Sequence, residues 1–92
     1  MRLLIVEDEK NLCDTVAKSL YDKGYEVDTC YDGDEALEYI LAEDYDLIVL
    51  DLNLPGMDGM DILKELRQKD EDTKVLILSA RSQIADKVEG LD

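Results

Sequence analysis

The sequence predicts an α/β fold built on a parallel sheet. Its 92 residues alternate short apolar runs with longer amphipathic stretches, in the order βαβαβαβα. The apolar runs at residues 2–6, 46–50 and 74–78 show no polar alternation, which is typical of strands that helices cover on both faces. Because helices connect these parallel strands, right-handed crossovers are expected. A chain of this length is expected to form one small domain.

The first half of the chain predicts a helix, an edge strand and a second helix. Residues 9–23 carry apolar side chains at helical spacing and are followed by a glycine that can end a helix. That apolar stripe comprises Leu12, Cys13, Val16, Ala17 and Leu20. Residues 25–30 alternate polar and apolar, as expected of an edge strand with one solvent-exposed face. Asp32 opens the second helix, whose expected buried side comprises Ala36, Leu37, Ile40 and Leu41.

The second half predicts a second central strand, two helices and an apolar fourth strand. Residues 46–50 form the strand, and a Pro-Gly turn precedes a helix over residues 59–69. The inward-facing residues of that helix are Ile62, Leu63 and Leu66. After the strand at 74–78, Ser82 can cap a last helix.

The edge character of residues 25–30 predicts the strand order 2-1-3-4, with the first and third strands side by side. By the crossover rule, the first helix lies alone on one face of the sheet, opposite the other helices. The fourth strand is as apolar as the central ones and is expected to need a neighbour on each side. We therefore expect the domain, over residues 1–92, to lack its fifth βα unit, roughly 30 residues. An exposed edge and a bare face over the third and fourth strands predict a homodimer or oligomer.

Three acidic residues stand at the ends of two buried strands. Glu7 and Asp8 follow the first strand, and Asp51 follows the strand at 46–50. In a 2-1-3-4 sheet the winding direction reverses between the first and third strands, and ligands bind at the carboxyl ends of the strands there. Carboxylates collected at one sheet edge repel one another, so a cation is needed to neutralise them. The sequence therefore predicts a cation site.

Composition and charge argue against several functions. The chain has 24 acidic and 10 basic residues and a net charge of −14, which disfavours direct binding of nucleic acid or of an anionic membrane by this segment. It has no histidine, and its two cysteines form no CxxC pair, which disfavours a zinc site. Without a signal peptide or a long apolar run, the protein is expected to be cytoplasmic with reduced thiols.

Three segments resemble the receiver domain of bacterial two-component response regulators. They are LIVEDE at residues 4–9, DLIVLDLNLPGMDG at 46–59 and VLILSAR at 75–81, and the similarity continues along the whole chain. The last two segments are most similar to regulators with a C-terminal winged-helix DNA-binding domain. The resemblance implies a flavodoxin-like, CheY-like fold and a phosphoacceptor that is not an enzyme acting on other molecules.

The resemblance also implies roles for the acidic residues. Asp51 matches the residue that accepts a phosphoryl group from a sensor histidine kinase. Glu7 and Asp8 match the acidic pair that, with Asp51, holds Mg²⁺. Asn53 matches the position whose backbone carbonyl also binds the metal.

Two residues after the fourth strand match the family's switch. Ser79 matches the hydroxyl that turns toward the new phosphoryl group, and Ala80 matches the small residue beside it. The family also uses a lysine and an aromatic residue of a fifth strand, and neither has a counterpart in this sequence. We therefore expect residues 1–92 alone to be phosphorylated poorly.

The segment that begins at Asp51 has two alternative interpretations as an acidic motif. It imitates the start of an EF-hand loop, but Pro55 and Ile62 stand where that loop needs ligands, and a strand precedes it. It also partly resembles a haloacid-dehalogenase-type phosphatase motif, except that Asn53 replaces the second acid and the chain is short for that fold. Absence of turnover on phosphate esters would remove the second interpretation.

Less specific interpretations of the acids stay open from the sequence alone. The run from Glu7 to Glu9 can be a helix cap with first-turn acids. The chain can also be a receiver-derived fragment that no longer phosphorylates and serves as a folding or interaction unit. Its response to acetyl phosphate or beryllofluoride with Mg²⁺ separates that interpretation from an active receiver.

Overall fold

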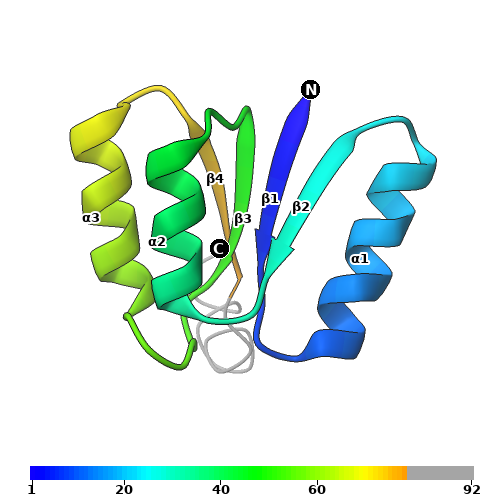
Figure 1. Ribbon diagram of the computed structural model, residues 1–92, viewed down its shortest axis with the longest axis horizontal. Coiled ribbons are helices and arrows are strands. Elements are labelled where there is room, and N and C mark those ends of the chain that lie inside the picture. Colours follow the sequence, from blue (N-terminus) through cyan, green and yellow to red (C-terminus); the bar gives the residue numbers. More distant parts are fainter. Residues whose placement is uncertain (79–92) are drawn as a thin grey trace, which may run out of the picture.

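Residues 1–78 of the computed structural model form a four-stranded sheet with helices on both faces (Figure 1), and the structure is described for these residues. Strands and helices alternate along the chain in the order β1 (Arg2–Val6), α1 (Lys10–Asp22), β2 (Glu26–Cys30), α2 (Gly33–Ala42), β3 (Leu47–Asp51), α3 (Gly59–Lys69) and β4 (Lys74–Leu78). The predicted bounds of these strands and of the first and third helices agree with the structure to within one residue at each end. The helix expected after Ser82 lies outside the described residues.

The sheet order is β2-β1-β3-β4, and every neighbouring pair is parallel. The predicted order 2-1-3-4 is therefore confirmed. Strands β1 and β3 pair in register from Leu3 opposite Leu47 to Val6 opposite Leu50. Because the two strands run in the same direction, their carboxyl ends lie side by side at one edge of the sheet.

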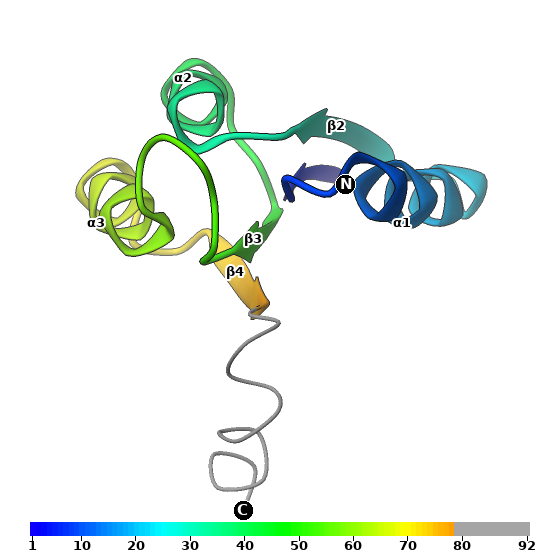
Figure 2. The same cartoon turned by 90° about the horizontal axis from the view of Figure 1, so that it is seen from below.

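The helices divide between the two faces of the sheet as the crossover rule predicts. Figure 2 shows α1 alone on one face, with α2 and α3 on the other. On the α1 face, the buried residues are Ile5, Cys13 and Val49. The opposite face is larger, and its buried cluster comprises Leu4, Val6, Cys30, Ala36, Ile40, Tyr45, Ile48, Leu50, Ile62 and Leu66. Both faces of the central strands are thus removed from water, in agreement with their uninterrupted apolar sequence.

An acidic N-cap precedes each of the three described helices. Glu9 accepts hydrogen bonds from two backbone N–H groups of α1, Asp32 caps α2, and Asp58 caps α3. Carboxylates at these positions satisfy free N–H groups and interact favourably with the positive end of the helix dipole. Of the three acids at residues 7–9, Glu9 is the N-cap, which leaves the other two available for a different role.

Two leucines expected in the helical stripes are exposed instead. Leu12 is 48% exposed in the first turn of α1, and Leu41 is 53% exposed in the last turn of α2. Helical spacing identifies a face, but it does not show how far along the helix that face is covered. Leu12 lines the cleft at the carboxyl edge of the sheet, and Tyr39 packs against the core at the end of α2.

Strand β4 lies at an edge of the sheet formed by residues 1–78. Three of its apolar side chains are largely exposed: Leu76 at 52%, Ile77 at 43% and Leu78 at 40%. The bare apolar face predicted over the third and fourth strands is present over β4 only, because Val49 of β3 is buried against α1 at 6% exposure. The expectation that residues 1–92 lack a fifth βα unit stays a prediction.

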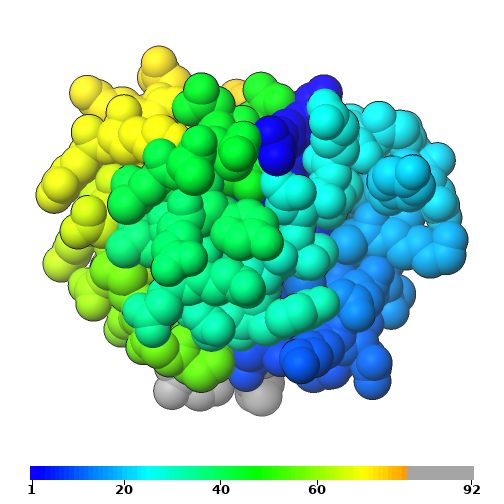
Figure 3. Space-filling model, in the orientation of Figure 1, coloured from blue at the N-terminus to red at the C-terminus, as the bar shows by residue number. Residues whose placement is uncertain are grey.

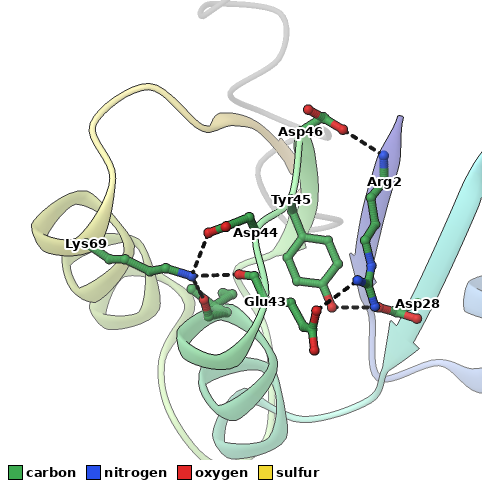
Figure 4. A network of polar contacts seen from close by, with 8 residues as sticks. Arg2, Asp28, Glu43, Asp44, Tyr45, Asp46 and Lys69 are labelled. Carbon is green, nitrogen blue, oxygen red and sulfur yellow. Dashed lines mark hydrogen bonds and ion pairs between the residues drawn. The ribbon is translucent and has the colours of Figure 1, made fainter.

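A polar network closes the opposite, amino-terminal edge of the sheet (Figure 4). The Arg2 guanidinium pairs with Asp28 of β2 at 2.9 Å and with Glu43 at 2.8 Å. The Tyr45 hydroxyl donates to the same Asp28 carboxylate at 2.7 Å, and the Arg2 N–H donates to Asp46 at 2.7 Å. These contacts join β1, β2 and the segment before β3, so they help to fix the register on which the site depends.

Lys69 joins the last turn of α3 to the end of α2 (Figure 4). Its ammonium donates to the carbonyls of Ile40 and Glu43 at 2.5 Å and 2.6 Å and lies 3.4 Å from the Asp44 carboxylate. Carbonyls at a helix C-terminus lack partners within the helix and carry partial negative charge, which a cation stabilises. This contact helps to hold the two helices together on one face.

Candidate functional site

Three carboxylates converge at the carboxyl edge of the sheet, between β1 and β3. Glu7, Asp8 and Asp51 each offer one oxygen, and these oxygens all lie within 4.8 Å of one another. Glu7 and Asp51 are buried at 8% and 6% exposure, whereas Asp8 is exposed. The structure therefore brings together the three acids that the sequence predicted to share a site.

Backbone groups hold the two buried carboxylates in place. The Glu9 N–H donates to Glu7 Oε2 at 2.9 Å, and the Asn53 N–H donates to Asp51 Oδ1 at 3.0 Å. The Glu7 N–H continues the sheet by donating to the Cys30 carbonyl at 3.1 Å. Because Asp51 is the last residue of β3, the strand itself fixes the direction in which its side chain leaves the sheet.

The cluster carries negative charge that the described side chains do not neutralise. None of the ion pairs within residues 1–78 involves these three acids. Burial raises the pKa of Glu7, and the charges of Asp51 and Asp8 raise it further, while the hydrogen bond from the Glu9 N–H opposes the shift. A group of carboxylate oxygens at this spacing fits a hard divalent cation such as Mg²⁺, which prefers oxygen ligands and keeps several waters.

The acids line a cleft of about 470 Å³ that also includes Glu9, Leu12, Asn53 and Leu78. A water molecule occupies roughly 30 Å³ in the liquid, so the cleft has room for a hydrated ion and a further small anion. Leu12 and Leu78 add apolar side chains to the lining of the cleft. Sequence reasoning assigned Leu12 to the core, and its place in the first turn after the acids was the signal that it lies by the site.

The other predicted site residues have different outcomes. Asn53 lies in the cleft, as expected of a residue two positions after Asp51. Ser79 and Ala80 lie outside the described residues. Leu78, immediately before Ser79, lines the cleft, and its carbonyl accepts a hydrogen bond from the Leu52 N–H at 3.0 Å. The switch roles of Ser79 and Ala80 stay predictions.

Comparison with known proteins gives a consistent result. The response regulator receiver domain family matches residues 3–92. The transcriptional regulatory protein DltR of Streptococcus agalactiae is 50% identical over 92 residues, which are 100% of this chain and 41% of DltR. The crystal structure of the response regulator TrrA of Thermotoga maritima, in complex with Mg²⁺ and BeF, has a TM-score of 0.82 and 36% identity, over 98% of this chain and 78% of that one. A second structure, of TrrA in complex with the histidine kinase ThkA, gives a TM-score of 0.78 and 39% identity. The match covers 86% of this chain and 68% of the matched chain.

The chain belongs to the response regulator receiver domain family. It is a CheY-like receiver domain of the two-component type, and a phosphoacceptor rather than a catalyst. It spans 41% of the length of DltR. Within residues 1–78, no helix has the length and apolar character needed to cross a membrane.

Proposed function

We propose that Asp51 accepts a phosphoryl group from the phosphohistidine of a sensor kinase, and that this switches the output of a longer transcriptional regulator. The convergence of Asp51, Asp8 and Glu7 within 4.8 Å carries the proposal. The complexes of TrrA with Mg²⁺ and BeF and with a histidine kinase support it. The regulatory name of DltR supports a transcriptional output for the longer protein.

For phosphoryl transfer to Asp51, the chain mainly has to position the carboxylate and balance the charge around it. Asp51 Oδ1 is held by the Asn53 N–H, and attack by Oδ2 forms an O–P bond while the P–N bond to the donor histidine breaks. The rigid strand end presents this carboxylate to the donor in one orientation. The acidic cleft then contains an acyl phosphate on Asp51, and the changed charge can bias the surrounding surface between two states.

The acids and the Asn53 carbonyl are the groups that would hold Mg²⁺. When bound, Mg²⁺ supplies positive charge that offsets repulsion between the carboxylates and the incoming phosphoryl oxygens. Glu7 and Asp8 would contribute ligands from the end of β1, and Asp51 would contribute one from β3. Both strands must therefore keep their register for the site to form.

Mass spectrometry of the intact protein after treatment with acetyl phosphate and Mg²⁺ tests this function. Wild-type protein is expected to gain one phosphoryl group, and Asp51→Asn is expected to gain none. Asp72→Asn, in the exposed loop before β4, is the matched control and is expected to label like the wild type. A label that persists in Asp51→Asn would place the acceptor elsewhere.

The alternative is a receiver-derived unit that no longer accepts phosphate. Beryllofluoride with Mg²⁺ separates the two, because an intact site responds to it and a purely structural unit does not. The expectation that residues 1–92 alone are phosphorylated slowly, for want of the family's lysine, stays a prediction. A phosphorylation rate equal to that of a full-length receiver domain would contradict it.

We also propose self-association through the exposed face of β4. Leu76 and Leu78 lie on the face of the sheet opposite α3, in the register of Val49 and Asp51, and both are largely exposed. Sedimentation of the wild type should show a concentration-dependent dimer, and Leu76→Lys should be monomeric. Leu41→Lys, on the exposed side of α2, is the control and should dimerise normally. A wild-type protein that stays monomeric at high concentration would contradict this proposal.

A cytoplasmic location fits the state of the cysteines. Cys13 and Cys30 are both free and buried, and free thiols are the rule in reducing compartments. We propose that the kinase meets this domain there.

A further inference from the structure

The loop between β3 and α3, residues 52–58, packs closely against the first turn of α2. The Gly33 N–H donates to the Pro55 carbonyl at 2.9 Å. A Cβ on Gly33 would lie 2.0 Å from the Met57 carbonyl oxygen and 2.8 Å from the Met57 carbonyl carbon and nitrogen. Figure 3 shows the loop and the beginning of α2 against each other at the lower edge of the view. The backbone of the loop thus occupies the space where a side chain would be.

Glycine is needed at this position for space and not for its backbone conformation. Within residues 1–78 the glycines with positive φ are Gly24 and Gly56, so Gly33 has a φ that other residues adopt. Helix propensity alone would favour alanine over glycine at the start of α2. The close approach of the Met57 backbone is therefore the reason why residue 33 must be glycine.

The same loop is confined on its other side by the start of α3. A Cβ on Gly59 would lie 2.9 Å from Leu52 Cα and 3.1 Å from the Asp51 carbonyl oxygen. Between these two contact points the loop carries Asn53, whose N–H holds the Asp51 carboxylate. A shift at either contact point therefore reaches Asp51 and Asn53 through a few backbone bonds.

We propose that Gly33 is a positioning residue for the loop that carries Asn53, and so for the cation site of Asp51, Asp8 and Glu7. The inference rests on the proposed function, because it concerns the same site. Gly33 touches neither the carboxylates nor the cleft. It acts by letting the Met57 backbone pack against α2 and by donating its N–H to Pro55.

A methyl group at residue 33 must displace the loop. Real Cβ atoms essentially never come within 3.0 Å of another heavy atom. The Cβ at residue 33 would lie 2.0 Å from the Met57 carbonyl oxygen, so this oxygen must move away by roughly 1 Å. The contacting atoms belong to the backbone and cannot rotate away. Loss of outer contacts that orient metal ligands typically lowers metal affinity about 10- to 100-fold. We expect Gly33→Ala to weaken Mg²⁺ binding about tenfold or more.

Titration with Mg²⁺ by NMR, at a temperature where each protein is folded, tests the proposal. Gly24→Ala is the matched control, because a Cβ there meets nothing within 4 Å while its φ of +99° is strained. Both substitutions are expected to lower stability, but Gly33→Ala alone should weaken Mg²⁺ binding and shift the Asn53 amide resonance. Equal Mg²⁺ affinity in Gly33→Ala and wild type would overturn the inference while leaving the proposed function intact.

Hydrogen exchange in the wild-type protein gives an answer even if Gly33→Ala fails to fold. If Mg²⁺ binding requires the packed loop, saturating Mg²⁺ should slow exchange at the Gly33 amide, which is bonded to Pro55. The Lys23 amide, which donates to the Leu20 carbonyl at the far end of α1, is the control. Its exchange should slow only as much as the increase in global stability requires. An unchanged Gly33 rate, with Mg²⁺ bound, would overturn the proposal. A wild-type protein that binds no Mg²⁺ would instead refute the proposed function.

Discussion

The carboxylates of Asp8, which follows β1, and of Asp51, the last residue of β3, have oxygens within 4.8 Å of each other. The pairing of β1 with β3 creates this proximity, since the two residues are far apart in the sequence. Like charges at this spacing raise the free energy of the folded state unless a cation lies between them. The site therefore has measurable effects on stability as well as on chemistry.

Removal of one charge should stabilise the metal-free protein. In EDTA, we expect Asp51→Asn to raise the free energy of unfolding by about 1 kcal/mol, the order of the repulsion between two unit charges about 4 Å apart in water. Urea unfolding of both proteins measures it. Asp72→Asn, far from the cluster, should leave stability unchanged within about 0.5 kcal/mol. A clear loss of stability in Asp51→Asn would show that the carboxylates do not repel one another.

Magnesium should stabilise the wild-type protein, because it neutralises the repelling carboxylates. A ligand that binds only the folded state adds about 2.7 kcal/mol to the unfolding free energy at one hundred times its dissociation constant. We expect Mg²⁺ to stabilise the wild type in this way and Asp8→Asn to lose most of the effect. Thermal unfolding across a series of Mg²⁺ concentrations is the measurement. Equal stabilisation of the two proteins would mean that Asp8 is not a ligand.

The two cysteines should be unreactive while the protein is folded. Burial raises the pKa of Cys13 to about 11 and that of Cys30 to about 12. Iodoacetamide at pH 8 should label neither thiol without denaturant and both with it, because the thiolate is the nucleophile.

The same shifts make stability depend on alkaline pH. The folded state holds these protons more tightly than the unfolded state does, so the contribution of the two thiols is intact below pH 9 and decreases as pH rises toward 11–12. Urea unfolding from pH 8 to 10 should show stability falling. Rising stability over that range would contradict the burial of the thiols.

The network at the amino-terminal edge of the sheet should contribute to stability. We expect Tyr45→Phe to cost about 1.5 kcal/mol, because it removes a hydrogen bond to the charged Asp28. Tyr21→Phe is the control, since Tyr21 is 69% exposed. Urea unfolding of the three proteins compares them, and equal stability of all three would show that the hydroxyl of Tyr45 contributes nothing.

The sequence was sufficient to predict the sheet order and the meeting point of the acids. Uninterrupted apolar runs marked the covered strands, the alternation at residues 25–30 marked the edge, and the carboxyl ends of parallel strands had to meet. The contact between Arg2 and Asp28 was missed because it depends on the register of β1 with β2, which no local pattern encodes.

The glycine contact at the site was missed for a different reason. In the sequence, Gly33 looks like an ordinary first residue of a helix. Only the three-dimensional structure shows that the Met57 backbone fills the space beside it. Leu12 was misplaced because helical spacing identified its face but not the end of the sheet that covers it. Both errors concern how elements lie against one another in three dimensions.

A crystal structure of residues 1–92 grown with Mg²⁺ and beryllofluoride would show whether Asp8 and Asp51 share one cation. We expect beryllofluoride on the Asp51 carboxylate and Mg²⁺ coordinated by oxygens of Asp8 and Asp51, with Glu7 beside them. Beryllofluoride bound at another residue, or Mg²⁺ with no ligand from Asp8 or Asp51, would contradict it.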